Sequence, residues 1–403
     1  MIIQPKIRGF ICTTAHPVGC DTHVRQQIEY VKKQSPILNG PKKVLVIGAS
    51  TGYGLASRIV TAFAAKASTV GIFFERPCEN NKRTATAGWY NTAAFEKYAK
   101  AEKLYAKSFN EDAFSQEAKQ KVIAAIKKDL GPMDLIIYSL ASPRRIHPKT
   151  AQVAKSVLRP IGVPYTNKSI DFETNQVIEV TLPSATQEEI NQTVSVMGGE
   201  DWEMWIDALE QSNLLADGAM TIAYSYIGPE ITNAVYRRGT IGAAKDHLEQ
   251  TAKKLNERLR EKKGGAFVSV NKALVTQSSS AIPFIPLYFV LLMKVMKQKG
   301  VHENCIEQIY RLFSKRLYAG NSIPLDSEGR IRIDDFEMRE DIQREVNELW
   351  KKVSSQNVKD IADVQGYQED FLKLFGFGFS FCLCSKTLFP SFFDHPKIAI
   401  FLL

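Results

Sequence analysis

The stretch KKVLVIGASTGYGLASRIVTAFAAKASTVGIFFE, residues 42–75, decides the fold of this chain. It begins with the apolar run VLVI at 44–47, which suits a buried parallel strand. A glycine-rich turn, a helix-like stretch at 55–66 and a second apolar strand at 69–74 follow. Because strand, helix and strand are joined by short connections, we expect a βαβ unit with parallel strands.

The turn between the first strand and the helix has the pattern Gly48-x3-Gly52-x-Gly54. Gly48 permits a tight exit from the strand, Gly52 lets the chain approach a pyrophosphate closely, and Gly54 lets helix and strand pack together. The N-terminus of the helix then offers free N–H groups and a partial positive charge to phosphates. In this strand–turn–helix context the glycines predict a dinucleotide-binding site.

The alternation of strand and helix continues along the chain. Helices are expected at 114–130, 201–216 and 240–262, and strands at 133–138, 220–226 and 266–270. This order predicts an α/β fold, a Rossmann-type doubly wound parallel sheet with an elaborated substrate-binding portion. The composition, 44% hydrophobic and 24% charged over 403 residues, excludes a mainly disordered chain, a collagen and a coiled-coil rod.

We interpret residues 1–378 as a single elaborated domain. Its cofactor-binding core covers about 41–142 and 217–280. Residues 143–216 carry prolines, threonines and asparagines, with a hairpin around 176–182. We interpret them as a substrate-binding insertion over the carboxyl edge of the sheet, where open sheets bind ligands.

Residues 281–378 are expected to form a helical C-terminal part. Within it, the apolar run at 281–293 is too short and too interrupted to span a bilayer, so it either lines an apolar slot or packs in the core. Residues 379–403 form an atypical Phe-rich tail with few charges, to which no function is assigned.

The chain is basic, with 52 Lys and Arg against 43 Asp and Glu and a formal charge of +9. This balance suits an acidic partner, or it serves solubility alone. Six cysteines without zinc-ribbon spacing and a start without a signal-peptide core favour reduced thiols in a cytoplasmic protein. Six histidines without an HxxxH pair argue against a metal. We also expect no nucleic-acid partner, no stable membrane insertion and a monomer.

Two acidic positions bear on the cofactor. Glu75 closes the second strand, where a carboxylate accepts hydrogen bonds from ribose hydroxyls and repels a 2′-phosphate, which favours NADH over NADPH. Arg76 weakens this argument because it is able to pair with that phosphate, and a solvated loop acid is the alternative for Glu75. Asp112 and Ala113 follow a possible short strand at 104–108. They cradle the adenine, cap the helix at 114–130, or do both.

Tyr236 and Lys245 are separated by eight residues. In one continuous helix, positions nine apart are rotated by roughly 180° and lie about 13.5 Å apart along the axis, so the two side chains would face away from each other. We therefore expect a break near Gly239, with Thr240 as the N-cap and Lys245 in the second turn of the new helix. A solvated helix face is the alternative for Lys245.

The glycine turn and the Ser-Leu-Ala string after the third strand are typical of the short-chain dehydrogenase/reductase superfamily, whose chemistry needs a tyrosine hydroxyl and a lysine. Within that superfamily the chain closely resembles the bacterial trans-2-enoyl reductases of the Tyr-x8-Lys type. These are the distinct enoyl-acyl-carrier-protein reductase class grouped with trans-2-enoyl-CoA reductase. The resemblance covers residues 1 to about 378 and rests on strings at 8–20, 44–58, 86–91, 138–143, 196–199, 223–228, 275–283 and 374–377.

The resemblance implies a role for individual residues. Tyr236 looks like the proton donor, Lys245 like the cofactor-binding lysine and Tyr226 like a second, substrate-contacting tyrosine. The residues that look like the cofactor cleft are Gly48, Ala49, Ser50, Thr51, Gly52, Tyr53, Phe74, Glu75, Asp112, Ala113, Leu140, Ala141, Leu274, Val275 and Thr276.

The resemblance further implies NADH-dependent reduction of the C2=C3 bond of trans-2-enoyl thioesters on acyl carrier protein or CoA, the last reductive step of fatty-acid elongation. Hydride adds to C3, and Tyr236 and Tyr226 stabilise the enolate. Lys245 holds the cofactor ribose and lowers the pKa of the tyrosine by its charge. The alternatives are a carbonyl reductase of the wider superfamily and a non-catalytic NAD(H)-binding sensor.

Overall fold

Seven parallel strands form the central sheet of the computed structural model, in the order β5-β4-β3-β6-β11-β12-β13. The structure describes residues 3–8, 11–78, 83–282, 284–320 and 322–379. The strands of the sheet are β3 (Lys43–Ile47), β4 (Ser68–Phe73), β5 (Ala106–Asn110), β6 (Met133–Tyr138), β11 (Leu215–Ser225), β12 (Gly265–Val270) and β13 (Ile331–Arg332).

The strand order reverses at β3. From β3 the chain runs outward to β4 and β5, and it then returns to β6 on the other side of β3. This arrangement confirms the predicted Rossmann-type doubly wound sheet. Ligands of such sheets bind at the carboxyl ends of the strands that flank the reversal. The residues after Ile47 and after Tyr138 share that edge, so a site is expected between them.

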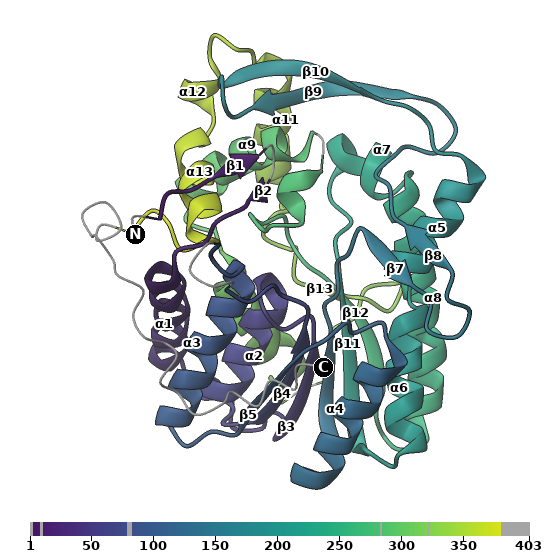
Figure 1. Ribbon diagram of the computed structural model, residues 1–403. Coiled ribbons are helices and arrows are strands. Elements are labelled where there is room, and N and C mark those ends of the chain that lie inside the picture. The colour runs from purple at the N-terminus through teal and green to yellow at the C-terminus, as the bar shows by residue number, and fades with distance from the viewer. Residues whose placement is uncertain (1–2, 9–10, 79–82, 283, 321, 380–403) are drawn as a thin grey trace.

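Helices cover both faces of the sheet, as Figure 1 shows. Successive side chains of β3 alternate between the faces, so that Val44 and Val46 join one buried cluster and Leu45 and Ile47 another. The helices that contribute to the first cluster are α1 (Pro17–Lys33), α2 (Gly52–Ala64), α3 (Ala87–Ala101) and α10 (Cys305–Leu312). Those of the second are α4 (Gln116–Asp129), α6 (Glu200–Gln211) and α8 (Thr240–Arg260).

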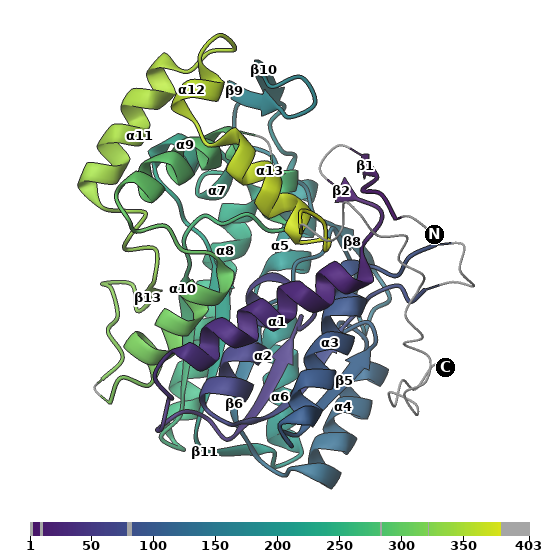
Figure 2. The ribbon, with the colours of Figure 1, turned by 90° about the vertical axis from the view of Figure 1, so that its left-hand side faces the viewer.

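A third buried cluster belongs to the part of the molecule drawn above the sheet in Figure 1. Its helices are α7 (Asn233–Tyr236), α9 (Ile285–Gln298), α11 (Glu340–Lys352), α12 (Val358–Ile361) and α13 (Val364–Lys373). The hairpin β9 (Tyr165–Asp171) and β10 (Gln176–Leu182) packs on this part through Phe172, whose ring stacks on Tyr367 at 4.5 Å. The view in Figure 2 shows the hairpin beside α12 and α13.

The remaining elements are short or peripheral. Strands β7 (Arg144–Ile146) and β8 (Val153–Lys155) pair within the insertion, and α5 (Gln187–Met197) packs against β8 and α8. Near the N-terminus, β1 (Ile7–Arg8) pairs with β2 (Ile11–Cys12). Across the described residues, no helix combines the length and apolar character that crossing a bilayer requires.

The structure differs from the sequence-based expectations for two strands. Strand β11 starts at Leu215, five residues before the expected start. The sequence pattern did not show this extension, because the register shifts between Leu215 and Met220 and interrupts the apolar run. Strand β13 lies in the part that was expected to be helical. It has only two residues, which are too few to show an alternating pattern in the sequence. The apolar run has two open interpretations, and the almost complete burial of the side chains of α9 favours core packing over the lining of a slot. Apart from Phe379, the Phe-rich tail lies outside the described residues.

Candidate active site

Two of the three glycines in the turn after β3 serve the fold. Gly48 has φ +89°, and a Cβ there would collide with the carbonyl oxygen of Ser139 after β6. A Cβ on Gly54 would collide with the carbonyl oxygen of Gly48. Gly52 differs, because the nearest atom to its Cβ position is Thr276 Cγ2 at 3.9 Å. The turn therefore leaves space at Gly52, beside the N-terminus of α2, where a pyrophosphate fits.

Glu75 lies against the glycine turn. Ser50 Oγ donates to Glu75 Oε1 at 2.7 Å, and Asn110 holds the backbone of Glu75 by two hydrogen bonds of 2.7 Å. The carboxylate is thus fixed at the end of β4, as a ribose-binding acid requires. Arg76 Nη1 donates to the carbonyl oxygen of Thr84 at 2.8 Å. Its guanidinium is engaged there, which weakens the competing interpretation that Arg76 selects a 2′-phosphate.

The expected adenine end is held by a buried ion pair. Lys119 Nζ donates to Asp201 Oδ1 at 2.7 Å and to the carbonyl oxygens of Ala113 and Phe114 at 3.0 and 3.1 Å. Burial lowers the pKa of Lys119 and raises that of Asp201, while the ion pair opposes both shifts. This pair fixes the loop that follows β5.

The helix-cap interpretation of Asp112 is wrong. Helix α4 is capped by Ser115, whose Oγ accepts from Ala118 N at 3.1 Å, because the helix begins two residues later than expected. Asp112 Oδ1 instead accepts from Phe114 N at 3.0 Å and shapes the loop. Phe74, at the far side of the turn, is 78% exposed, so its ring is free to cover a bound ring system.

The chain breaks between Tyr236 and Lys245, as the spacing argument requires. Tyr236 ends α7, and Lys245 lies in the second turn of α8. The N-cap is Gly239 and not Thr240, because the Thr240 hydroxyl is used elsewhere and donates to the carbonyl oxygen of Val157. The predicted break is confirmed, and the predicted cap is one residue off.

Lys245 points at the strand that precedes the second tyrosine. Its Nζ donates to the carbonyl oxygen of Tyr224 at 3.2 Å, so it is not a member of a solvated helix face. Burial lowers the pKa of Lys245 to about 8. The ring of Tyr224 lies 5.6 Å from that of Tyr53, whose hydroxyl donates to the carbonyl oxygen of Lys272 at 2.8 Å. These contacts connect the lysine to the glycine turn.

The two tyrosines of the expected reacting end are packed together. The ring centroids of Tyr226 and Tyr236 are 4.6 Å apart with an interplanar angle of 78°. Within the described part of the chain, the hydroxyl of Tyr236 makes no hydrogen bond, whereas Tyr226 Oη donates to Glu337 Oε1 at 2.8 Å. Tyr236 is thus the phenol whose proton is available.

Tyr236 has a raised pKa in this structure. Burial is the main cause, and electrostatic interactions with Glu337 and Tyr367 add to it. The expectation that Lys245 lowers the pKa of the tyrosine is not met in the protein alone: that pKa is raised, and the charge of Lys245 is not among the causes of the shift. Tyr236 is therefore a neutral phenol at physiological pH, in the state that donates a proton.

The loop after β12 meets the glycine turn. Ser279 Oγ donates to the carbonyl oxygen of Leu274 at 2.7 Å and accepts from Thr276 N at 2.9 Å, which closes Leu274, Val275 and Thr276 into a compact turn. Thr276 is the residue nearest to Gly52. Leu140 and Ala141 follow β6 at the same edge, next to Gly48.

Sequence reasoning missed several side chains that support the site. Glu337 contacts Tyr226, Lys119 and Asp201 fix the loop at Ala113, and Tyr367 Oη donates to Ser280 Oγ at 3.0 Å. None of them belongs to a short motif, and their partners are up to 111 positions away. Their burial and their long-range hydrogen bonds identify them, and both require coordinates.

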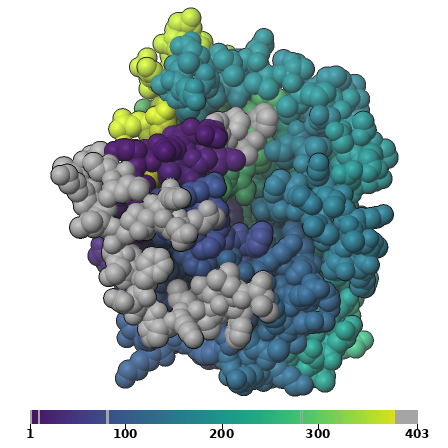
Figure 3. All heavy atoms as spheres, in the orientation of Figure 1, coloured from purple at the N-terminus to yellow at the C-terminus, as the bar shows by residue number. Residues whose placement is uncertain are grey.

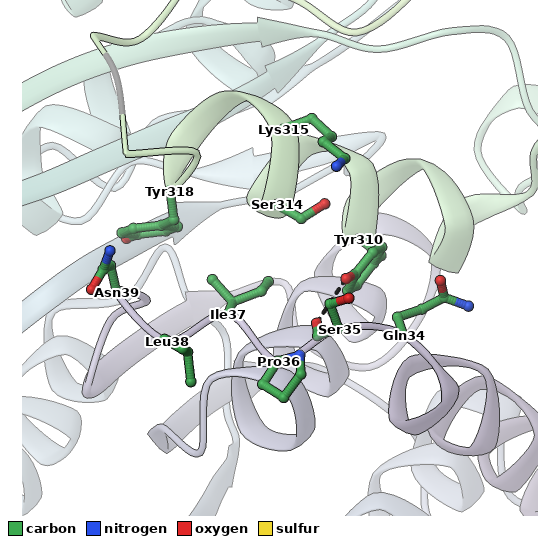
Figure 4. A pocket seen from close by; sticks show the side chains of 10 residues that line it. All are labelled: Gln34, Ser35, Pro36, Ile37, Leu38, Asn39, Tyr310, Ser314, Lys315 and Tyr318. Carbon is green, nitrogen blue, oxygen red and sulfur yellow. Dashed lines mark hydrogen bonds between the residues drawn. The ribbon is translucent and has the colours of Figure 1, made fainter.

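The surface shows two further features. In the space-filling view, teal atoms of the insertion and purple atoms of the N-terminal segment lie on the same face (Figure 3). A surface pocket of about 350 Å³ lies between the loop 34–39 and residues 310–318, and Figure 4 shows Tyr310 over it. The lining residues of this pocket belong to neither the glycine turn nor the tyrosine pair. Among the described residues, no group of three or more His, Cys, Asp and Glu is placed to hold a metal.

Three family models match the chain. Residues 2–80 match the NAD(P)H binding domain of trans-2-enoyl-CoA reductase, and residues 83–318 match the trans-2-enoyl-CoA reductase catalytic region. Residues 325–381 match the enoyl reductase FAD binding domain. In that part, β13 is followed by residues 333–339, which contain no glycine. Directly after β13, therefore, the chain has no glycine turn of the kind that follows β3.

Named relatives are similar over nearly the whole chain. The trans-2-enoyl-CoA reductase [NADH] of Ruminiclostridium cellulolyticum is 61% identical over 379 residues, which cover 94% of this chain and 95% of the relative. The enoyl-[acyl-carrier-protein] reductase [NADH] of Coxiella burnetii is 60% identical over 380 residues, which cover 94% and 93%.

Solved structures have the same fold. The trans-2-enoyl-CoA reductase of Clostridium acetobutulicum in complex with NADH superposes with a TM-score of 0.92 at 46% identity, covering 94% of this chain and 96% of that chain. The trans-2-enoyl-CoA reductase of Treponema denticola in complex with NAD gives a TM-score of 0.91 at 50% identity, with the same coverage.

Proposed function

The chain belongs to the trans-2-enoyl-CoA reductase family, and from this premise we propose how its own residues carry out the NADH-dependent reduction of trans-2-enoyl thioesters. It is an oxidoreductase of the EC 1.3.1 class, acting in fatty-acid synthesis with NADH as cofactor. The observation that carries the proposal is the pair of tyrosines, of which only Tyr236 keeps its hydroxyl proton uncommitted.

The residues at the sheet edge fit NADH. The open space at Gly52, beside the N-terminus of α2, suits the pyrophosphate, and Glu75 suits the ribose hydroxyls. Lys245 has one hydrogen bond to Tyr224 and further N–H groups to offer to the other ribose. When bound, NADH supplies a hydride, which the reaction places on C3 of the enoyl thioester.

Tyr236 then acts on the thioester oxygen. Negative charge moves to that oxygen as C3 is reduced, and a neutral phenol stabilises the charge by donating a hydrogen bond. The raised pKa of Tyr236 keeps this proton on the phenol until the charge develops. The enolate then takes up one proton at C2, supplied by way of the Tyr236 hydroxyl and replaced from water, which completes the saturated acyl thioester. Tyr226 lies beside Tyr236 and shapes the same wall, with its own proton directed to Glu337.

The test of this function is Tyr236→Phe, which removes the hydroxyl and keeps the ring. We expect kcat for crotonyl-CoA to fall by about 10²–10³, the usual cost of one donor to a developing oxyanion, while the Kd for NADH stays within about twofold. Tyr310→Phe is the matched control, because its hydroxyl bonds the carbonyl oxygen of Ser35 at the surface pocket. Undiminished reduction of crotonyl-CoA by Tyr236→Phe would refute the assignment.

We propose that both acyl carrier protein and CoA thioesters are substrates, since relatives of each name are about equally similar. The formal charge of +9 favours approach of an acidic carrier protein. We also propose that the enzyme acts in the cytoplasm as a monomer. NADH oxidation with matched enoyl chains on the two carriers tests the first point, and turnover with one carrier alone would contradict it.

A further inference from the structure

Glu337 is a fully buried carboxylate with three donors. Its Oε1 accepts from Tyr226 Oη at 2.8 Å and from Tyr288 Oη at 2.7 Å, and its Oε2 accepts from Ala273 N at 2.6 Å. It follows β13 by five residues, at the point where the third cluster meets the sheet. Burial raises the pKa of Glu337, and its hydrogen bonds and the charge of Lys272 oppose that shift.

Two of the three donors belong to the reacting end. Tyr226 packs edge to face on Tyr236, and Ala273 immediately precedes the loop Leu274 to Thr276, which meets the glycine turn. One carboxylate therefore fixes both a tyrosine of the reacting pair and the loop beside the expected nicotinamide. The burial of a charge at such a point costs free energy, which argues for a use beyond packing.

Further hydrogen bonds hold the backbone of Glu337 and its partner Tyr288 in place. Gln343 Nε2 donates to the carbonyl oxygen of Glu337 at 2.7 Å and to Tyr288 Oη at 3.1 Å. Lys272 Nζ, also buried, donates to the carbonyl oxygen of Ala273 at 2.9 Å and provides a balancing charge. This shell leaves Glu337 little freedom to turn, so the direction of its bond to Tyr226 is set by the fold.

We propose that Glu337 is a positioning residue of the reaction: by accepting a hydrogen bond from Tyr226 it fixes that phenol as an acceptor toward the site, so that Tyr236 is the phenol of the pair that donates to the substrate. The inference rests on the proposed function, because it assigns Glu337 a task only if Tyr236 is the donor. A phenol has one proton, and Tyr226 has committed its proton to Glu337.

Glu337→Gln tests the proposal with almost no change in shape. The amide oxygen is able to keep the bond from Ala273 N, and the amide NH2 group then donates to the two phenols in place of accepting from them. The proton of Tyr226 is released toward Tyr236. We expect kcat for crotonyl-CoA to fall about tenfold, while KM for crotonyl-CoA and Kd for NADH stay within about twofold. An unchanged kcat in the folded variant would overturn the proposal.

Tyr288→Phe is the matched control, because it removes the other phenol from the same carboxylate oxygen and leaves the bond to Tyr226 in place. We expect its kcat to stay within about twofold of the unmodified enzyme, although its Tm falls. If Tyr288→Phe and Tyr226→Phe lower kcat equally, the carboxylate has a packing role and the proposal fails. This comparison holds even if Glu337→Gln does not fold.

A double variant shows whether Glu337 acts through Tyr226. With Tyr226→Phe in place, adding Glu337→Gln should lower kcat by less than about twofold more, because the bond that the change reverses is already gone. A further tenfold loss would mean that Glu337 acts by another route. Tyr236→Phe is measured in the same assay. If it retains full turnover the proposed function fails, whereas wild-type turnover of Glu337→Gln alone removes only this inference.

Discussion

The cofactor end of the site draws its side chains from residues 48–141, whereas the reacting end combines segments near 224–245, 271–276 and 337–367. At the cofactor end, consecutive strands and turns bring Gly48, Ser50 and Glu75 together. At the reacting end, contacts such as Tyr226 with Glu337 join residues that share no local pattern. The difference teaches that the proposed cofactor end is assembled mainly from neighbouring stretches of sequence, whereas the proposed reacting end depends on long-range packing.

The buried ion pair of Lys119 and Asp201 gives the strongest test of whether the cofactor end depends only on local sequence. It sits at the cofactor end, yet Asp201 comes from α6, far along the chain. Lys119→Met leaves Asp201 buried without its counter-charge, so we expect the free energy of unfolding to fall by about 3–5 kcal/mol. The NADH affinity should fall as well, because Lys119 also holds the carbonyl oxygen of Ala113. Urea unfolding and NADH titration measure the two effects.

The matched control is Lys119→Met combined with Asp201→Asn. The amide removes the unpaired charge and still accepts from Tyr138 Oη, which bonds Asp201 Oδ2 at 3.2 Å. We expect the double variant to recover at least half of the lost stability. A single Lys119→Met variant that loses less than about 1 kcal/mol would show that the cofactor end is as self-contained as its sequence pattern suggests.

Two glycines of the turn separate folding from cofactor binding at the cofactor end. We expect substitution of Gly54 to lower mainly stability and substitution of Gly52 to lower mainly NADH affinity. Gly54→Ala forces a Cβ onto the carbonyl oxygen of Gly48, so we expect a loss of about 2–3 kcal/mol in unfolding free energy. In Gly52→Ala the new methyl group lies in open space, so only the positive φ of +53° is unfavourable. We expect the free energy of unfolding to fall by about 1 kcal/mol. Its NADH affinity, however, should fall by about tenfold or more, since the methyl occupies the expected pyrophosphate position.

Both glycine variants are checked by thermal unfolding with and without NADH. A Gly52→Ala protein that still gains its normal Tm shift from NADH would place the pyrophosphate elsewhere. Equal destabilisation by the two changes would mean that Gly52 also serves the fold.

Lys245 lies between the proposed cofactor end and the proposed reacting end, and the pH dependence of activity tests its role there. Its pKa is lowered to about 8, so the ammonium is present below that pH and is lost above it. We expect kcat/KM for NADH to fall about tenfold per pH unit above pH 8, because this ratio reports the ionisation of the free enzyme. Tyr236, with its pKa raised, stays a neutral phenol in this range.

Lys245→Arg is the control for this pH profile, because a guanidinium stays charged throughout. Its activity should be lower but flat between pH 7 and pH 10. Lys272 has a pKa also lowered to about 8 by burial, so a decline that persists in Lys245→Arg would assign the titration to Lys272.

Much of the fold was predictable because its signals are local. Apolar runs predicted strands such as Met133–Tyr138, and the glycine pattern predicted the turn after β3. The geometry of a Tyr-x8-Lys spacing was enough to require the break at Gly239. The two predicted helix caps failed for different reasons: the nearby Ser115 caps α4 in place of Asp112, and the Thr240 hydroxyl donates to the carbonyl oxygen of Val157, which is 83 positions away.

The reacting end was predictable only in part. Tyr236, Tyr226 and Lys245 were identified by resemblance, and the structure brings the two tyrosines into contact. The raised pKa of Tyr236 and the bond from Tyr226 to Glu337 depend on burial, which no sequence period encodes. A glutamate in the string Phe336-Glu337-Met338 looks like any surface acid until coordinates place it inside.

The position of β13 has a consequence for the newly made protein. A nascent chain of about 280 residues holds the glycine turn, both tyrosines and the lysine, but β12 then presents an unpaired edge, which strands of other chains are able to join. Synthesis of Ile331 and Arg332 pairs the carboxyl end of that edge, at Ser269 and Val270, and Glu337 follows five residues later. Part of the exposed edge is therefore covered at nearly the same stage of synthesis at which Glu337 becomes available, after the residues of the glycine turn have been made.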